Sequence, residues 1–126
     1  MPSQEPLVKP REGDALIVVD VQNDFLPAGA LGVPEGDEVV PVLNKYSELF
    51  EELGLPIAAT RDWHPENHCS FEAQGGPWPP HCVAGTDGAA FATALDLHGD
   101  TKVISKAQTP EEEAYSGFQG TELNQW

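Results

Sequence analysis

Three short runs of apolar and β-branched residues constrain the fold more than any other feature of this sequence. They cover Ala15–Val19, Pro56–Thr60 and Thr101–Ser105, and a charged residue directly follows each run. Runs this short are typical of strands, and an unbroken apolar run such as Ala15–Val19 is typical of a strand buried on both faces, as in a parallel sheet. We therefore predict one strand over each range.

The segments between these runs predict how the strands are connected. After a Pro/Gly-rich connection over 27–36, Asp37 suits the N-cap of a helix, Pro41 its first turn and Gly54 its C-cap. Apolar residues recur there at helical spacing, at Val39, Val40, Leu43, Leu49, Phe50 and Leu53. A long loop over 65–88 and a short helix over 89–95 precede the third run. This alternation predicts an α/β fold, a three-layer α/β/α arrangement with a parallel, Rossmann-like sheet.

Length and charge exclude several classes of protein. The chain has 126 residues, about one domain, and its 21 acidic against 6 basic residues give a net charge of −15. Such a surface repels nucleic acid and anionic membranes, so we expect neither as a partner. Met1–Gly13 is a polar leader without the apolar core of a secretory signal, and the longest apolar run is too short to span a bilayer. With only Cys69 and Cys82, we expect reduced thiols and a cytoplasmic location.

Chemically active residues gather at the predicted strand ends. Ligands of parallel α/β sheets bind beyond the carboxyl ends of the strands. Asp20, Asp62 with His64, and Lys106 all fall at that edge. The sequence therefore places a candidate site there.

Asp62 and His64 are the strongest local signal for a metal ion. Residues two apart in an extended segment project to the same side, so the carboxylate and the imidazole can converge on one ion. His81, which follows two prolines, is a candidate third ligand and His68 a candidate fourth. Such a set suits zinc, iron(II) or manganese. The plainer interpretation is that these are loop residues that make hydrogen bonds and bind no metal. It is the favoured one when only Asp62 and His64 are considered. The further histidines strengthen the metal interpretation but do not make it the favoured one.

The other candidates each have two interpretations. Asp20 either caps backbone amides of the next turn, which is favoured for the residue taken alone, or performs acid–base work with a shifted pKa. Lys106 is either a solvated strand-end lysine or a charged partner that lowers the pKa of a neighbouring thiol. Phe25 and Trp78 either stack on a planar substrate ring or pack in the core.

The two cysteines are poor candidates for a nucleophile. A catalytic thiol needs an adjacent base and an electropositive pocket such as a helix N-terminus. Neither Cys69 nor Cys82 begins a helix after a strand, so we expect both to be structural. Asp24 and Glu111–Glu113 are expected to be solvated charges.

Taken together, these segments resemble the nicotinamidase/pyrazinamidase branch of the isochorismatase-like cysteine hydrolases. The similarity begins near Asp14 and continues to the end of the chain, with the matching stretches in family order. They are residues 15–25, 61–65, 78–83 with 85–86 and 88–89, and Lys106 followed by 114–118.

The resemblance implies a role for each matching residue. Asp20 would be the general base and acid of an Asp–Lys–Cys triad, with Lys106 as its charged partner. Asp62, His64 and His81 would hold a divalent metal, zinc first and iron or manganese as alternatives, with His68 left open. Phe25 and Trp78 would line the pyridine pocket. The implied reaction converts nicotinamide and water to nicotinate and ammonia, a step of NAD salvage.

The chain also departs from the family pattern. The family's nucleophilic cysteine lies on a later strand-to-helix turn in a Gly/Ala-rich segment, and no such segment follows Lys106 in this sequence. We therefore expect residues 14–126 to be the N-terminal portion of an isochorismatase-like hydrolase domain, truncated after about the third strand and inactive alone. A homo-oligomer of the full-length protein stays open. The alternatives are a hydrolase of another small substrate and a metal-binding fragment without catalysis.

Overall fold

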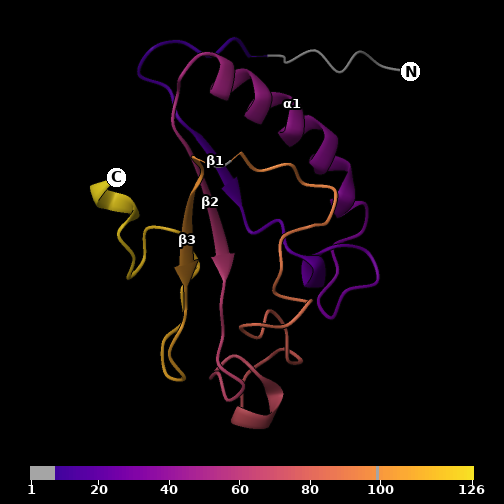
Figure 1. Cartoon of the computed structure of the whole chain (residues 1–126). Helices are drawn as coiled ribbons and strands as arrows, with labels where there is room; N and C mark the ends of the chain where they lie inside the picture. Colours follow the sequence, from indigo (N-terminus) through magenta and orange to yellow (C-terminus); the bar gives the residue numbers. More distant parts are fainter. Residues whose placement is uncertain (1–7, 99) are drawn as a thin grey trace.

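A computed structural model describes residues 8–98 and 100–126, so residues 1–7 of the expected leader lie outside the described part. Its centre is a parallel three-stranded sheet with the strand order β1-β2-β3, and all strands point the same way in Figure 1. The strands are β1 (Leu16–Val19), β2 (Ile57–Asp62) and β3 (Lys102–Lys106). The predicted parallel α/β fold is confirmed, with β2 extending two residues further than predicted, to Asp62.

The first crossover is helical, as predicted. Helix α1 (Val39–Glu52) buries Val40, Ser47 and Phe50. The expected N-cap was wrong, because Asp37 lies inside a 3-10 turn, Gly36–Glu38, that precedes the helix. At the other end Gly54 adopts φ +69° and donates its N–H to the carbonyl of Glu51 (3.0 Å), so it closes the helix as the sequence predicted.

The second crossover contains a single 3-10 turn in its described part, Glu72–Gln74, and residues 89–95 form no helix, so the short helix predicted there was wrong. Its backbone groups bond elsewhere: Asn23 N–H donates to Ala90 O (3.0 Å) and Ala92 N–H donates to Val21 O (2.9 Å). These bonds form a short antiparallel bridge with the chain that follows β1. A segment whose amides and carbonyls are paired across the molecule cannot also pair them along a helix.

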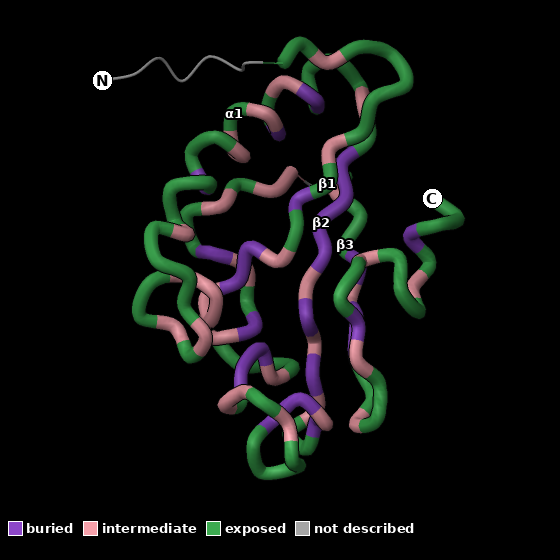
Figure 2. The backbone as a smooth tube through the Cα atoms, turned by 180° about the vertical axis from the view of Figure 1, so that it is seen from behind, coloured by how far each residue is buried: buried purple, intermediate pink, exposed green. Residues whose placement is uncertain are grey.

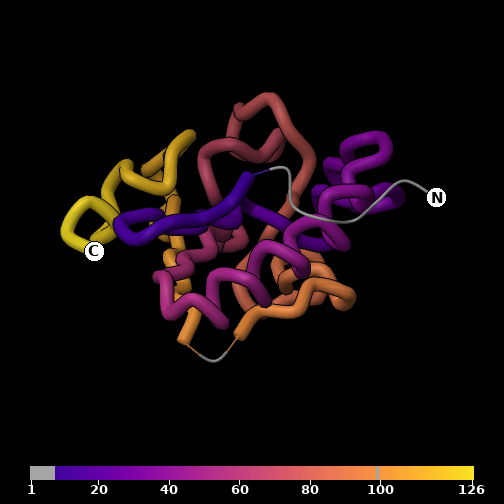
Figure 3. Tube along the Cα trace, turned by 90° about the horizontal axis from the view of Figure 1, so that it is seen from above, coloured from indigo at the N-terminus to yellow at the C-terminus, as the bar shows by residue number. Residues whose placement is uncertain are grey.

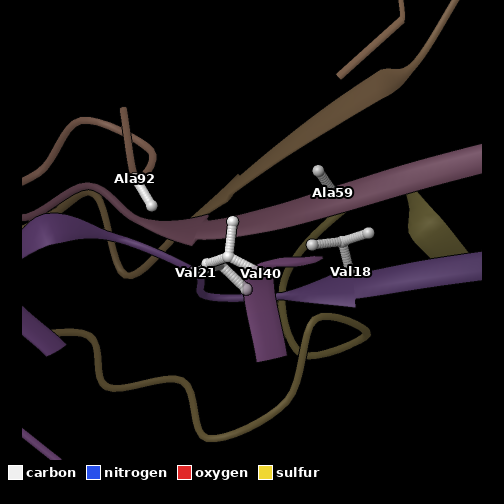
Figure 4. Packing of buried hydrophobic residues seen from close by; sticks show 5 residues of the cluster. All are labelled: Val18, Val21, Val40, Ala59 and Ala92. Atoms are coloured by element: carbon white, nitrogen blue, oxygen red, sulfur yellow. The ribbon is translucent and has the colours of Figure 1, made fainter. Parts of the chain in front are cut away.

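The two sheet faces are covered unequally. One face packs against α1 and the second crossover through Val18, Val21, Val40, Ala59 and Ala92, which gather in Figure 4. On the opposite face Ala58 and Ile104 pack against Leu123 of the C-terminal segment. This segment and α1 lie on different sides of the strands (Figures 1 and 3).

Burial is complete only along the middle of the sheet. Strand β2 is buried at every position except Arg61, as the colouring of Figure 2 shows. In β1, Val18 is fully buried but Val19 is 62% exposed. The expectation that β1 is buried on both faces was therefore wrong, because no helix among the described residues covers its second face. None of the described helices has the length and apolar character needed to cross a membrane.

Candidate metal centre and active site

A buried lysine joins two carboxylates at the carboxyl edge of the sheet. Lys106, only 4% exposed, places its Nζ 2.9 Å from Asp20 Oδ2 and 2.5 Å from Asp62 Oδ1. The second oxygen of Asp20 accepts a hydrogen bond from Thr60 Oγ1 (2.8 Å). Neither plainer interpretation holds: Lys106 is not solvated, and the carboxylate of Asp20 bonds side chains rather than the amides of the next turn.

The charges in this group stabilise one another against burial. Burial alone would lower the pKa of Lys106, but the hydrogen bonds and charges of Asp62 and Asp20 outweigh it, so this pKa lies above its ordinary value. Burial would likewise raise the pKa of Asp62, yet hydrogen bonds with His64 and Lys106 bring it below the ordinary value. Asp62 and Lys106 are therefore each favoured in the charged form.

Asp62, His64 and His81 form a buried cluster whose potential ligand atoms all lie within 4.8 Å of one another. A carbonyl oxygen only accepts hydrogen bonds, so His64 donates its Nδ1–H to Ala107 O (3.0 Å) and His81 donates its Nδ1–H to Pro79 O (2.9 Å). These bonds place the proton of each neutral imidazole on Nδ1, so Nε2 is the nitrogen that can bind a ligand; when His64 is protonated, its Nε2–H instead faces Asp62 Oδ2, 3.6 Å away. A carboxylate and two oriented imidazoles fit a divalent metal with open coordination positions.

His68 lies beside this cluster but bonds away from it. Its ring stacks on His64, with the ring centres 4.0 Å apart. Its Nδ1 accepts a hydrogen bond from Ser70 Oγ (2.7 Å), and its Nε2–H donates to Glu112 O (2.6 Å). Both ring nitrogens are thus engaged with protein groups, so this arrangement leaves His68 no lone pair for a metal.

Phe25 and Trp78 both lie against His81. The centre of the Phe25 ring is 5.8 Å, and that of the Trp78 ring 5.9 Å, from the imidazole of His81. A cavity of about 330 Å³ adjoins Asp20 and Lys106, and its lining includes Val19, Thr60 and Phe118. The two aromatic rings therefore border the cluster of candidate metal ligands, while the cavity borders the Asp20–Lys106 pair.

The two cysteines are free thiols. Cys82 is fully buried; burial and the charges of Asp62, Asp24 and Asp20 together raise the pKa of its thiol well above the ordinary value. A thiol so disfavoured as a thiolate is a poor nucleophile. Cys69 is partly exposed, and its sulfur lies 4.0 Å from Nε2 of His68.

Sequence reasoning missed two residues next to the site. Gln22 is fully buried, and its side-chain amide bonds both backbone groups of Asp62. Asp24, expected to be solvated, accepts a hydrogen bond from Cys82 N–H (2.8 Å). Their partners are 40 and 58 residues away in the sequence. No local pattern carries that information.

The backbone beside the site is strained. Among non-glycine residues, Asp20 (φ 54°), Cys82 (φ 50°) and Ala107 (φ 54°) adopt the left-handed region, as do Ala28 and Glu35. The first three are a site residue or the neighbour of one. Such conformations cost about 1–3 kcal/mol each and persist where surrounding contacts impose them.

The sheet and the cluster together define an α/β protein with a candidate metal-binding site and a buried acid–lysine pair at the carboxyl edge of its strands. Comparison with known proteins places it more narrowly. Residues 14–126 match the isochorismatase domain, and the chain belongs to this family.

Similar proteins include nicotinamidases and pyrazinamidases. The nicotinamidase of Escherichia coli is 37% identical over 133 residues, which cover 89% of this chain and 62% of that protein. A pyrazinamidase of Pyrococcus horikoshii in complex with zinc is 59% identical, with a TM-score of 0.85. The match covers 88% of this chain and 61% of the pyrazinamidase chain. PnC1 of L. infantum in complex with nicotinate is 44% identical with a TM-score of 0.75, covering 82% of this chain and 52% of its own. This chain thus spans less than two thirds of each relative.

Proposed function

We propose that this chain is part of a nicotinamidase, which hydrolyses nicotinamide to nicotinate and ammonia in the cytoplasm as a step of NAD salvage. The observation that carries the proposal is the continuous network from Asp20 through Lys106 and Asp62 to His64. This network joins the Asp20–Lys106 pair to the candidate metal ligands in one buried group. The relatives named nicotinamidase support the choice of substrate.

Asp62, His64 and His81 would hold the metal, for which zinc is proposed because the Pyrococcus horikoshii relative was solved with it. A bound divalent metal at this position supplies a fixed positive charge that orients a polar substrate. His68 supports the cluster by stacking on His64 rather than by ligation. The rings of Phe25 and Trp78 would pack on the pyridine ring of the substrate.

Asp20 would move the protons of the reaction. Its carboxylate would take the proton of a cysteine thiol, the thiolate would add to the amide carbonyl, and Asp20 would return the proton to the departing ammonia. Water would then hydrolyse the thioester to nicotinate and regenerate the thiol. Lys106 would hold Asp20 in place through their ion pair (2.9 Å).

We further propose that neither Cys69 nor Cys82 is the nucleophile, so residues 1–126 alone do not turn over nicotinamide. The raised pKa of Cys82 supports this proposal. Purified 1–126 should bind zinc and release no ammonia from nicotinamide. Turnover by 1–126 that a Cys69→Ala or Cys82→Ala change abolishes would contradict it.

The substrate proposal is tested on the full reading frame. With zinc, iron(II) or manganese loaded in turn, we expect ammonia release from nicotinamide, and an Asp20→Asn change should reduce it by at least about 100-fold, a common effect of removing an acid–base group. Absence of ammonia at every metal loading would exclude a nicotinamidase. Activity only on another small amide would favour a different hydrolase of the same family.

A further inference from the structure

The side chain of Gln22 makes three hydrogen bonds in the interior. Its Nε2 donates to Asp62 O (2.8 Å) and to Ala89 O (2.8 Å), and its Oε1 accepts from Asp62 N–H (2.9 Å). The residue is fully buried. A buried amide with all these bonds satisfied is rigid, because breaking any one leaves an unpaired polar group in the interior.

This amide takes the place of a strand neighbour for Asp62. Strand β1 pairs with β2 only from Leu16↔Ile57 to Val19↔Thr60, so the pairing ends before Asp62. On its other side Asp62 pairs with Lys106 of β3. Gln22 therefore holds the backbone of Asp62 from the side that β1 no longer reaches, and the direction of the Asp62 carboxylate follows from that backbone.

Asp24 holds the segment that supplies His81, the candidate ligand on the other side of the site. Its Oδ2 accepts a hydrogen bond from the N–H of Cys82 (2.8 Å), the residue after His81. Cys82 adopts φ +50°, a conformation that needs such an external contact to persist. The turn that contains Gln22 and Asp24 thus contacts both the segment that supplies Asp62 and the segment that supplies His81.

We propose that Gln22 and Asp24 are positioning residues that hold Asp62 and His81 at the separation a divalent metal requires. The inference rests on the metal site of the proposed function. It adds that metal affinity depends on two residues that do not bind the metal. A role in stability alone is the competing explanation, and the two differ in what they predict for metal binding.

The experiment compares three single changes in the turn of this chain. Gln22→Met keeps the length of the side chain and removes its hydrogen bonds, and Asp24→Asn keeps the shape and removes the charged acceptor. Asn23→Ala is the matched control, since the side-chain amide of Asn23 donates to Asp87 O (2.7 Å), which is not part of the cluster. Zinc affinity is measured by competition with a chromophoric chelator, the visible spectrum of bound cobalt(II) reports ligand geometry, and urea unfolding gives the stability of the metal-free chain.

We expect Gln22→Met and Asp24→Asn each to weaken zinc binding by about 10–100-fold, as is usual when residues that orient metal ligands are lost, and to alter the cobalt spectrum. Asn23→Ala should leave both unchanged. Zinc affinity and cobalt spectra equal to those of the unaltered chain, with only stability reduced, would overturn the inference. If Gln22→Met does not fold, Asp24→Asn decides by the same criteria.

Failure of the proposed function gives a different result. If the unaltered chain binds neither zinc nor cobalt, the metal site and this inference are both overturned. If the chain binds zinc and the variants weaken it, the inference stands even where the full reading frame does not hydrolyse nicotinamide.

Discussion

At the scale of single residues, Lys106 is the group on which the site's charges depend. It is the cation between Asp20 and Asp62, and all three side chains are largely buried. Lys106→Met would leave two carboxylates without this partner, so we expect the free energy of unfolding to fall by about 3 kcal/mol. Urea denaturation measures it. The control is Lys102→Met: Lys102 pairs with Glu122 at the surface (3.8 Å), where we expect a loss below about 1 kcal/mol. Equal losses would contradict the assignment.

The same lysine predicts a dependence of stability on alkaline pH. The pKa of Lys106 is raised in the folded chain, so its contribution is fully present below the unfolded value, about 10.4, and is lost as pH rises through the folded pKa. Unfolding free energies of the metal-free chain should therefore decline above that pH. The difference between the unaltered chain and Lys106→Met should shrink over the same range, and a constant difference would refute the shift.

Substitution of His68 tests whether this residue is a metal ligand or only supports the ligands. Because both its ring nitrogens bond protein groups, His68→Ala should destabilise the chain by about 1–3 kcal/mol, the cost of leaving buried partners unpaired. Zinc affinity should change much less than in His64→Ala, which removes a ligand. Chelator competition on the two variants tests this, and an equal loss of affinity in both would identify His68 as a ligand.

At the scale of elements, the sequence predicted the strands better than the connections. Apolar runs locate β1, β2 and β3 because burial of a strand requires them, and strand ends of a parallel sheet share one edge. For that reason Asp20, Asp62, His64 and Lys106 could be expected to lie together, and the structure places them so. The crossover at 89–95 could not be predicted, because its conformation depends on bonds to residues 21 and 23.

Gly88, which lies against Asp24 of the turn after β1, should tolerate no side chain. A Cβ on Gly88 would overlap the carboxylate of Asp24, whereas one on Gly54 would meet nothing within 4 Å. Gly54→Ala should therefore cost only the left-handed penalty, about 1 kcal/mol. Gly88→Ala should cost more and should also weaken zinc binding, because Asp24 must move away from Cys82. Urea unfolding and chelator competition on both variants check this, and unchanged zinc affinity in Gly88→Ala would contradict it.

At the scale of the whole molecule, one face of the sheet is covered over β2 and β3 but apolar and open along β1. Val19 is 62%, Phe118 54% and Ile17 36% exposed, and no strand among the described residues pairs with the free edge of β1. An open apolar edge favours association between copies of a chain.

Val19→Lys should therefore reduce self-association of 1–126 and change the free energy of unfolding by less than about 0.5 kcal/mol, as for most surface positions. Light scattering during incubation measures the first quantity. Val39→Lys is the control, since Val39 is 47% exposed but lies on α1, which covers the other face of the sheet. If both changes reduce scattering equally, net charge rather than the edge governs association.

The left-handed residues beside the site set a limit on engineering. Glycine at Ala107 would remove a steric penalty of about 1–2 kcal/mol, yet it would also free the carbonyl that orients His64. The same conflict holds at Asp20 and Cys82, but not at Ala28 or Glu35, which are strained away from the cluster. Laboratory evolution that selected for heat resistance alone would replace all five residues by less strained ones. The changes at Asp20, Cys82 and Ala107 would also destroy the site. A screen that also rewards metal retention would keep those three and improve the chain at the other two.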